Sequence, residues 1–238
     1  MNYKYKYNKY KNKYLNLKST MNWGATNVAT NVAITYPLNI LLDAVKIGAL
    51  EVQIIQNSHE QSEFIESFIS CIIQLSNDID KYFNLFTTLE NYSNQEFIRK
   101  YLFIYGNPIS TINPHLDAVK AKMRIFKELI NIKKVITFNI LNDIEGRDVM
   151  NWNQDNDMIS ISMTRINEIM DKDNYQVKIA SIILHELTHM FIATGDYAYA
   201  PIDDPNELFN RVHSKPYIIW ANNADHYKVL YQLMKMYE

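Results

Sequence analysis

Apolar side chains recur at helical spacing along much of the 238-residue chain. The stretch 115–130 is the clearest case, because its apolar residues follow one another at steps of three and four and form one stripe. These residues are Leu116, Val119, Met123, Phe126 and Ile130. Similar spacing predicts further helices, which cover 38–56, 58–75, 94–105, 205–214 and 217–236.

Two stretches have the pattern of strands. Residues 134–140, KVITFNI, are rich in β-branched and aromatic side chains, and residues 157–163, DMISISM, alternate apolar residues with serine. The segment between them is expected to be a loop or a hairpin. An apolar helix should then begin near Asp173 or Asn174, whose side chains can cap free N–H groups. It should end near Gly195, which tolerates a left-handed backbone.

Glycine and proline, which interrupt helices and strands, are rare, with only five Gly and six Pro in the chain. Such a composition favours long helices over many short strands. Apolar residues make up 47% of the chain, which is enough for a sizeable core. No internal repeat or linker stands out beyond residue 20, so the predicted fold class is α+β, mostly helical, in one unit.

The first residues differ from the rest in charge. Residues 1–18 hold six Lys and no Asp or Glu, whereas the formal net charge of the whole chain is −2. Tyr, Lys and Asn repeat here almost without aliphatic residues, so this tail cannot build a packed face and is expected to be disordered. A solvated tail explains the composition better than a basic arm for an acidic partner. The net charge gives the chain no general reason to bind nucleic acid.

The sequence also bears on the membrane and on redox chemistry. No apolar run is long enough to span a bilayer, and the Lys-rich start lacks the apolar segment of a signal peptide. We therefore expect a cytoplasmic protein, or one exported or delivered by a non-classical route. Cys71 is the only cysteine, so an intramolecular disulfide is impossible, and its apolar neighbours predict a buried thiol.

The segment HELTHM, residues 185–190, carries the strongest chemical signal. Residues four apart lie on one face of a helix, so His185 and His189 can direct two imidazoles at one zinc ion. Glu186 is turned by about 100° from His185, which places its carboxylate beside the open metal position, where it can take a proton from water. If these residues were ordinary core residues, three polar groups of a very apolar helix would need buried partners. We therefore predict a zinc site.

A catalytic zinc also needs a third protein ligand. The extended motif H-E-x-x-H-x-x-G-x-x-H fails here, because no His stands at the required position. The segment IATGDYAYAP (192–201) follows instead, with Asp196 just after the glycine and Tyr199 three residues later. NADHY (223–227) comes next.

These motifs resemble those of the aspzincins, the deuterolysin-like metallopeptidases that include the lysine-specific metalloendopeptidases. Aspzincins pair HExxH with GTxDxxYG, and ATGDYAYA (193–200) matches the second motif at Thr194, Asp196 and Tyr199. Its first and last residues are Ala where the family has Gly. The resemblance implies that Asp196 is the third zinc ligand and that Tyr199 helps to stabilise the oxyanion.

Two further motifs extend the resemblance. NADHY fits the family's NADxY, and YLFIYG (101–106) is similar to its YxxWFG. We therefore divide the chain into a disordered tail (1–20), a helical N-terminal region of unknown role (21–99) and an aspzincin-like catalytic region (100–238). The resemblance implies a zincin-like fold, with a small sheet above the active-site helix. We expect the strand MISIS to form the exposed sheet edge, where an extended substrate could pair by strand addition.

One departure from the family concerns specificity. In the lysine-specific relatives, the Asp of NADxY and a Glu three residues later form an acidic S1′ pocket. Here Asp225 is kept, but Lys228 replaces the Glu. We expect Asp225 to line this pocket or to orient a zinc ligand, and we expect no preference for Lys at P1′. The acidic residues of PIDDPNELF could substitute, although a solvated helix start explains them better.

The sequence thus predicts a zinc-dependent endopeptidase acting on protein or peptide substrates. A toxin or effector role is compatible with the lack of a signal peptide and of disulfides. The alternative is a catalytically inactive binding module on a protease fold, but such a module would not need Glu186. A structural zinc site is disfavoured by the shortage of cysteine.

Overall fold

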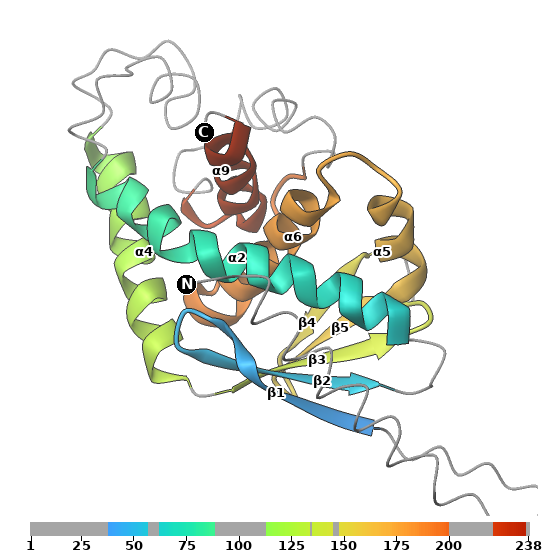
Figure 1. The fold of residues 1–238 in the computed structure, drawn as a ribbon. Coiled ribbons are helices and arrows are strands. Elements are labelled where there is room, and N and C mark those ends of the chain that lie inside the picture. The colour runs from blue at the N-terminus through green and yellow to red at the C-terminus, as the bar shows by residue number, and fades with distance from the viewer. Residues whose placement is uncertain are drawn as a thin grey trace, which may run out of the picture. The chain divides into compact units, whose positions relative to one another are not determined.

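The computed structural model describes residues 38–56, 62–88, 113–133, 135–144, 148–199 and 221–236. All of them belong to one compact unit, residues 36–238. Five helices and one five-stranded sheet are found within these ranges, which confirms the α+β class (Figure 1). The Lys-rich tail, the YLFIYG motif and the helices predicted over 94–105 and 205–214 lie outside the described residues.

The sheet is mixed, with the strand order β1-β2-β3-β5-β4. The strands are β1 (Leu38–Ile47), β2 (Leu50–Gln56), β3 (Val135–Leu141), β4 (Met150–Asn153) and β5 (Met158–Ser162). The outer pairs β1/β2 and β4/β5 are antiparallel, whereas β3 pairs in parallel with β2 and β5. In β3 the side chains of Ile136, Phe138 and Ile140 are buried and alternate with half-buried ones. The strands predicted over 134–140 and 157–163 are therefore confirmed.

The helix predicted over 38–56 is wrong, because this segment forms the β1/β2 hairpin. Gly48 opens the two-residue turn between Ile47 and Leu50 with a φ of +62°, a conformation that favours glycine. In β2, Val52 and Ile54 are buried and alternate with half-buried residues, which is the period of a strand. Because β2 pairs with β3, this hairpin belongs to the same sheet as the strands near the site.

The prediction that MISIS forms the exposed sheet edge is also wrong. β5 lies between β3 and β4, and β4 pairs only with β5 in the described part of the chain. The reason is that part of the segment before MISIS, for which the sequence predicts a loop or a hairpin, folds back as strand β4. The sheet edge on this side is therefore Met150–Asn153.

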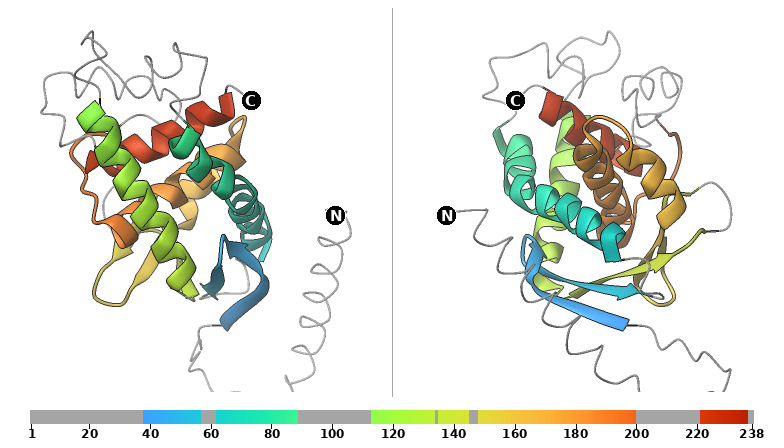
Figure 2. Two further views of the ribbon diagram at one scale, coloured as in Figure 1. Left: turned by 90° about the vertical axis from the view of Figure 1, so that its left-hand side faces the viewer. Right: turned by 45° about the vertical axis from the view of Figure 1, so that its right-hand side comes forward.

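The helices lie on one face of the sheet, as both views of Figure 2 show. They are α2 (Ser62–Thr88), α4 (Asn113–Ile132), α5 (Met163–Met170), α6 (Tyr175–Ile192) and α9 (Ala224–Met236). The helices predicted over 115–130 and up to Gly195 are confirmed as α4 and α6, and the one predicted over 58–75 is confirmed as the first part of α2. Helix α9 forms the last part of the helix predicted over 217–236. The short helix α5, which begins after Ser162, has no counterpart among the predicted elements. None of the helices in the described ranges is long and apolar enough to cross a membrane.

Helix α6 carries HELTHM and contacts the helices α2, α4, α5 and α9 and the strand β4. Asn174 stands at its N-cap as expected, but its side chain makes no capping hydrogen bond. The left-handed C-cap is Ala193, with φ 48°, and not Gly195 as predicted. Gly195 has another role, because a Cβ there would come within 3.0 Å of the Tyr197 ring.

Helix α9 is fixed to α2 by buried polar contacts. The Tyr82 hydroxyl donates to the carbonyl oxygen of Tyr227 at 3.0 Å. Nearer the end of α9, Asp78 accepts hydrogen bonds from the Tyr231 hydroxyl at 2.7 Å and from Lys235 Nζ at 3.1 Å. These contacts attach α9 to α2 from Tyr227 to Lys235, whereas the start of α9 faces the candidate site. On α2, Cys71 is buried as predicted, and burial raises the pKa of its thiol to about 12.

Candidate metal centre

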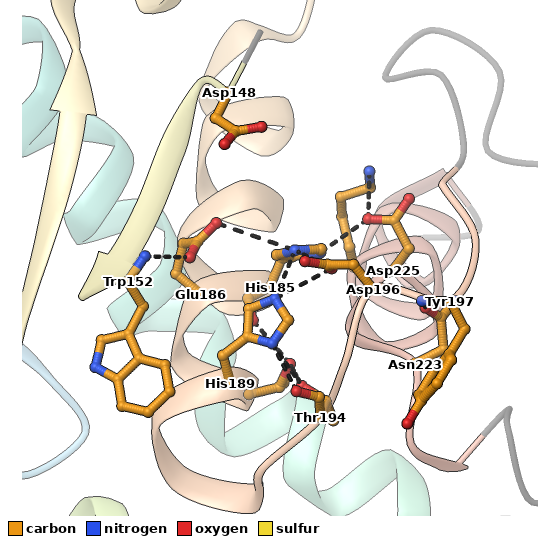
Figure 3. Close-up of polar contacts among 12 residues, drawn as sticks. Asp148, Trp152, His185, Glu186, His189, Thr194, Asp196, Tyr197, Asn223 and Asp225 are labelled. Atoms are coloured by element: carbon orange, nitrogen blue, oxygen red, sulfur yellow. Dashed lines mark hydrogen bonds and ion pairs between the residues drawn. The ribbon is translucent and has the colours of Figure 1, made fainter. Parts of the chain in front are cut away.

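Three side chains chosen from the sequence converge at the C-terminal half of α6. His185 Nε2 and His189 Nε2 lie 3.0 Å apart, and each lies 3.2 Å from Asp196 Oδ1 (Figure 3). A tetrahedral zinc with bonds of about 2.0–2.1 Å separates its ligand atoms by about 3.3–3.4 Å. A group of this composition and spacing can hold a metal ion.

The other nitrogen of each imidazole has a partner that fixes the ring. His189 Nδ1 lies 2.8 Å from the carbonyl oxygen of Thr194, which can only accept, so Nδ1 carries the hydrogen. His185 Nδ1 lies 2.8 Å from Asp225 Oδ1, although the approach is bent away from a linear hydrogen bond. Partners of this kind select the tautomer that leaves Nε2 free to bind a metal.

This tautomer choice has an electrostatic consequence. With hydrogen on both Nδ1 atoms, the lone pairs of two Nε2 atoms and a carboxylate oxygen face one another, which is unfavourable without a cation between them. In the absence of a metal, a second proton on an imidazole takes that place. Burial disfavours this charged form of His185, but Asp196, Asp225 and Glu186 together raise its pKa to about 9. The donor set therefore fits a divalent metal.

Asp196 is the most accessible of the three candidate ligands, with 37% of its side chain exposed. Partial burial opposes its ionisation, but the contacts with His185 and His189 outweigh this effect and hold its pKa well below the ordinary value. The carboxylate is thus ionised at neutral pH, which is the form that binds a metal.

Glu186 lies beside this group without joining it. Its Oε1 is 4.0 Å from His185 Nε2, while its Oε2 accepts a hydrogen bond of 2.8 Å from the backbone N–H of Trp152 on β4. Burial raises the pKa of Glu186, and the neighbouring histidines and the Trp152 N–H oppose that rise only in part. A carboxylate in this position is suited to exchange a proton with a water molecule next to the metal position.

Tyr199 lies over the same group from the loop that follows α6. Its ring is nearly parallel to the His185 ring, with centroids 6.3 Å apart and an interplanar angle of 23°. Burial is the main cause that raises the pKa of the Tyr199 hydroxyl, and the neighbouring Asp196 carboxylate raises it further. The hydroxyl thus keeps its proton near neutral pH and can donate it in a hydrogen bond.

Asp225 and Lys228 form a buried pair behind His185. Lys228 Nζ lies 2.7 Å from Asp225 Oδ1, and 1% of the Asp225 side chain and 9% of the Lys228 side chain are exposed. Burial opposes ionisation of Asp225, but His185 and Lys228 more than offset it and lower the pKa of the carboxyl. Of the two roles that sequence analysis left open for Asp225, this geometry favours orientation of His185.

Three contacts around the site were missed by sequence analysis. They are the Trp152 N–H at Glu186, the Thr194 carbonyl at His189 and the side chain of Asn223 at the loop that holds Asp196. The first two use backbone atoms and leave no residue signature. Asn223 lies in the NADHY motif, which was noted without a role for this residue.

The chain has been compared with protein-family models and with curated proteins, and neither comparison finds a match. The likeness to aspzincins therefore rests on the motifs in the sequence.

Proposed function

We propose that the chain is a zinc-dependent endopeptidase of the aspzincin type with a zincin-like fold. The observation that carries the proposal is the convergence of His185 Nε2, His189 Nε2 and Asp196 Oδ1, with Glu186 alongside. A binding module without catalysis gives no reason for Glu186 to be buried next to these atoms and tied to the sheet edge. The catalytically inactive alternative is therefore disfavoured.

In the proposed reaction, His185, His189 and Asp196 would hold the metal. A bound Zn²⁺ polarises a carbonyl oxygen and lowers the pKa of water. Glu186 accepts the proton that the attacking water loses and passes it to the leaving amine. The Trp152 N–H holds one oxygen of Glu186, so that the other faces the metal position. Tyr199 donates a hydrogen bond to the oxygen on which negative charge develops.

The edge strand β4 offers a place for the substrate backbone. Ser162 N–H donates to the Val149 carbonyl, so Val149 and Asn151 direct their backbone groups toward β5. Met150 and Trp152 then direct theirs to the side of β4 that faces away from β5, where no other strand of the described residues pairs, and the Trp152 N–H is already used by Glu186. An extended peptide would pair with Met150 by strand addition.

Digestion of casein tests the proposed endopeptidase activity. New peptide termini that no longer form when a chelator is added would support it. Casein that stays intact with the zinc-loaded protein would contradict it.

Tyr199→Phe is expected to lower kcat by roughly 10²–10³-fold, the usual effect of losing one oxyanion donor. Zinc content should stay near that of the wild type, because the phenylalanine ring still packs over His185. Tyr197→Phe is a matched control, since the two tyrosines are 49% and 50% exposed. Steady-state peptide hydrolysis and metal analysis check both variants. A parallel loss of zinc and activity in Tyr199→Phe would make the hydroxyl a structural group.

The cleavage pattern should show no preference for Lys at P1′. The ammonium of Lys228 neutralises Asp225, so this pair gives a cationic substrate side chain little electrostatic reason to bind. Digestion of a peptide library, analysed by mass spectrometry, measures the preference. Lys228→Glu should move the pattern toward Lys. Wild-type cleavage mainly at X–Lys bonds would contradict the prediction and point to residues 203, 204 and 207, outside the described part of the chain.

A further inference from the structure

Asn223 stands just before α9 and is completely buried. Its side chain makes three hydrogen bonds to the backbone of the loop after α6. Oδ1 accepts from Tyr197 N–H at 3.1 Å and from Ala198 N–H at 3.3 Å, and Nδ2 donates to the Ala198 carbonyl at 3.0 Å. A short side chain that both accepts and donates meets these requirements, and an amide is the group that does so without a charge.

The backbone on either side of Asn223 contacts the same loop at Gly195, two residues before Tyr197. Gly195 N–H donates to the Asn222 carbonyl at 2.7 Å, and Ala224 N–H donates to the Gly195 carbonyl at 3.0 Å. Asp196 is therefore bracketed by contacts at Gly195 on one side and at Tyr197 and Ala198 on the other (Figure 3).

This bracket matters because Asp196 is the one candidate ligand that no helix positions. His185 and His189 project from the buried helix α6, whereas Asp196 and Tyr199 belong to a loop without regular structure. The place of the Asp196 carboxylate depends on what holds the loop backbone. Ligands whose supporting contacts are removed commonly lose metal affinity even though they are themselves unchanged.

We infer that Asn223 is a positioning residue for the metal centre. It holds the loop so that the Asp196 carboxylate reaches the two histidines and Tyr199 lies over His185. The same turn continues into Asp225, which contacts His185 Nδ1. Asn223 and Asp225, just before and at the start of α9, thus orient two candidate ligands, Asp196 through its loop and His185 through its ring. The inference rests on the proposed function, since it presupposes that these side chains bind a metal.

The test measures Zn²⁺ affinity of the full chain by competition with a chromophoric chelator. Asn223→Ala should weaken binding by about 10–100-fold, the usual effect of removing a group that orients a ligand. Asn223→Asp keeps the two accepted hydrogen bonds and loses the donated one, so an intermediate loss is expected. The visible spectrum of the Co²⁺-loaded protein should change in Asn223→Ala, because it reports the ligand set and not overall stability.

Asp78→Asn is the matched control, because it weakens the anchoring of α9 near its other end and leaves the loop contacts in place. It should keep wild-type Zn²⁺ affinity and the wild-type Co²⁺ spectrum. Equal affinity and spectrum in wild type and Asn223→Ala would overturn the inference, as would an equal loss in Asp78→Asn. If Asn223→Ala fails to fold, Asn223→Asp decides by the same criteria. A wild-type chain that binds no Zn²⁺ would instead refute the proposed function.

Discussion

Glu186→Gln is expected to retain one zinc ion per chain while peptide hydrolysis falls by roughly 10²–10⁴-fold, the range for loss of a general base. The amide is the same size as the carboxylate, and its oxygen can still accept the Trp152 N–H. It cannot take a proton from water at neutral pH, so binding and chemistry should separate. Metal analysis and casein hydrolysis on the same preparations measure the two effects.

A matched control for this variant is Glu168→Gln, the same chemical change at an exposed position on α5. Its activity and zinc content should equal those of the wild type. Near wild-type turnover by Glu186→Gln would show that Glu186 is not the base. Loss of zinc from the same variant would show that Glu186 belongs to the metal-binding group, despite its distance from the histidines.

Removal of a candidate ligand should have the largest effect. His185→Ala, His189→Ala and Asp196→Ala are each expected to abolish stoichiometric zinc or to weaken it severely, and hydrolysis should disappear with the metal. A bound zinc requires all three donors in this arrangement, and each substitution leaves only two. Inductively coupled plasma mass spectrometry of the purified variants gives the metal content.

Asp171→Ala, at the exposed C-cap of α5, is the control for the loss of a carboxylate away from the site. It should bind zinc like the wild type. Full zinc occupancy in Asp196→Ala would exclude Asp196 as a ligand, and Asp225 would then be the candidate to test, because it lies beside His185 Nδ1.

Helices with a clear apolar stripe were predictable, because their periodicity reflects one buried face. In α4 the buried residues Val119, Met123, Phe126 and Ile130 keep the spacing that the sequence showed. The helix predicted over 38–56 is wrong because short apolar runs fit both the helical and the strand period. Gly48, followed by the alternating residues Val52 and Ile54, is the feature of the sequence that indicates the hairpin.

Part of the candidate site could be predicted from residues close together in the sequence, whereas the rest depends on contacts between distant segments. His185, Glu186 and His189 lie within one helix, so their shared position follows from helix geometry alone. The contacts that orient them come from distant segments. Trp152 at the sheet edge contacts Glu186, and Asp225 in the first turn of α9 contacts His185. Asn223, just before α9, holds the loop that carries Asp196. Their pairing depends on how β4 and α9 pack against α6, which spacing along one chain does not reveal.

The structure gives Lys228 a second role that the sequence alone does not show. In the sequence it was a cation in place of an acidic residue, one helical turn from Asp225. In the structure it is also the buried counter-charge of the carboxylate that contacts His185. Lys228→Glu therefore alters the environment of a candidate metal ligand as well as the local charge.

The central claim is that one metal ion at His185, His189 and Asp196 enables peptide hydrolysis. Titration of Zn²⁺ into metal-free wild-type protein, with a fluorogenic casein substrate present, tests it most directly. The rate of hydrolysis should rise with added zinc and reach its maximum at about one equivalent, the stoichiometry of a single three-ligand site. Hydrolysis that is independent of zinc, or one equivalent of tightly bound zinc without any hydrolysis, would contradict the claim.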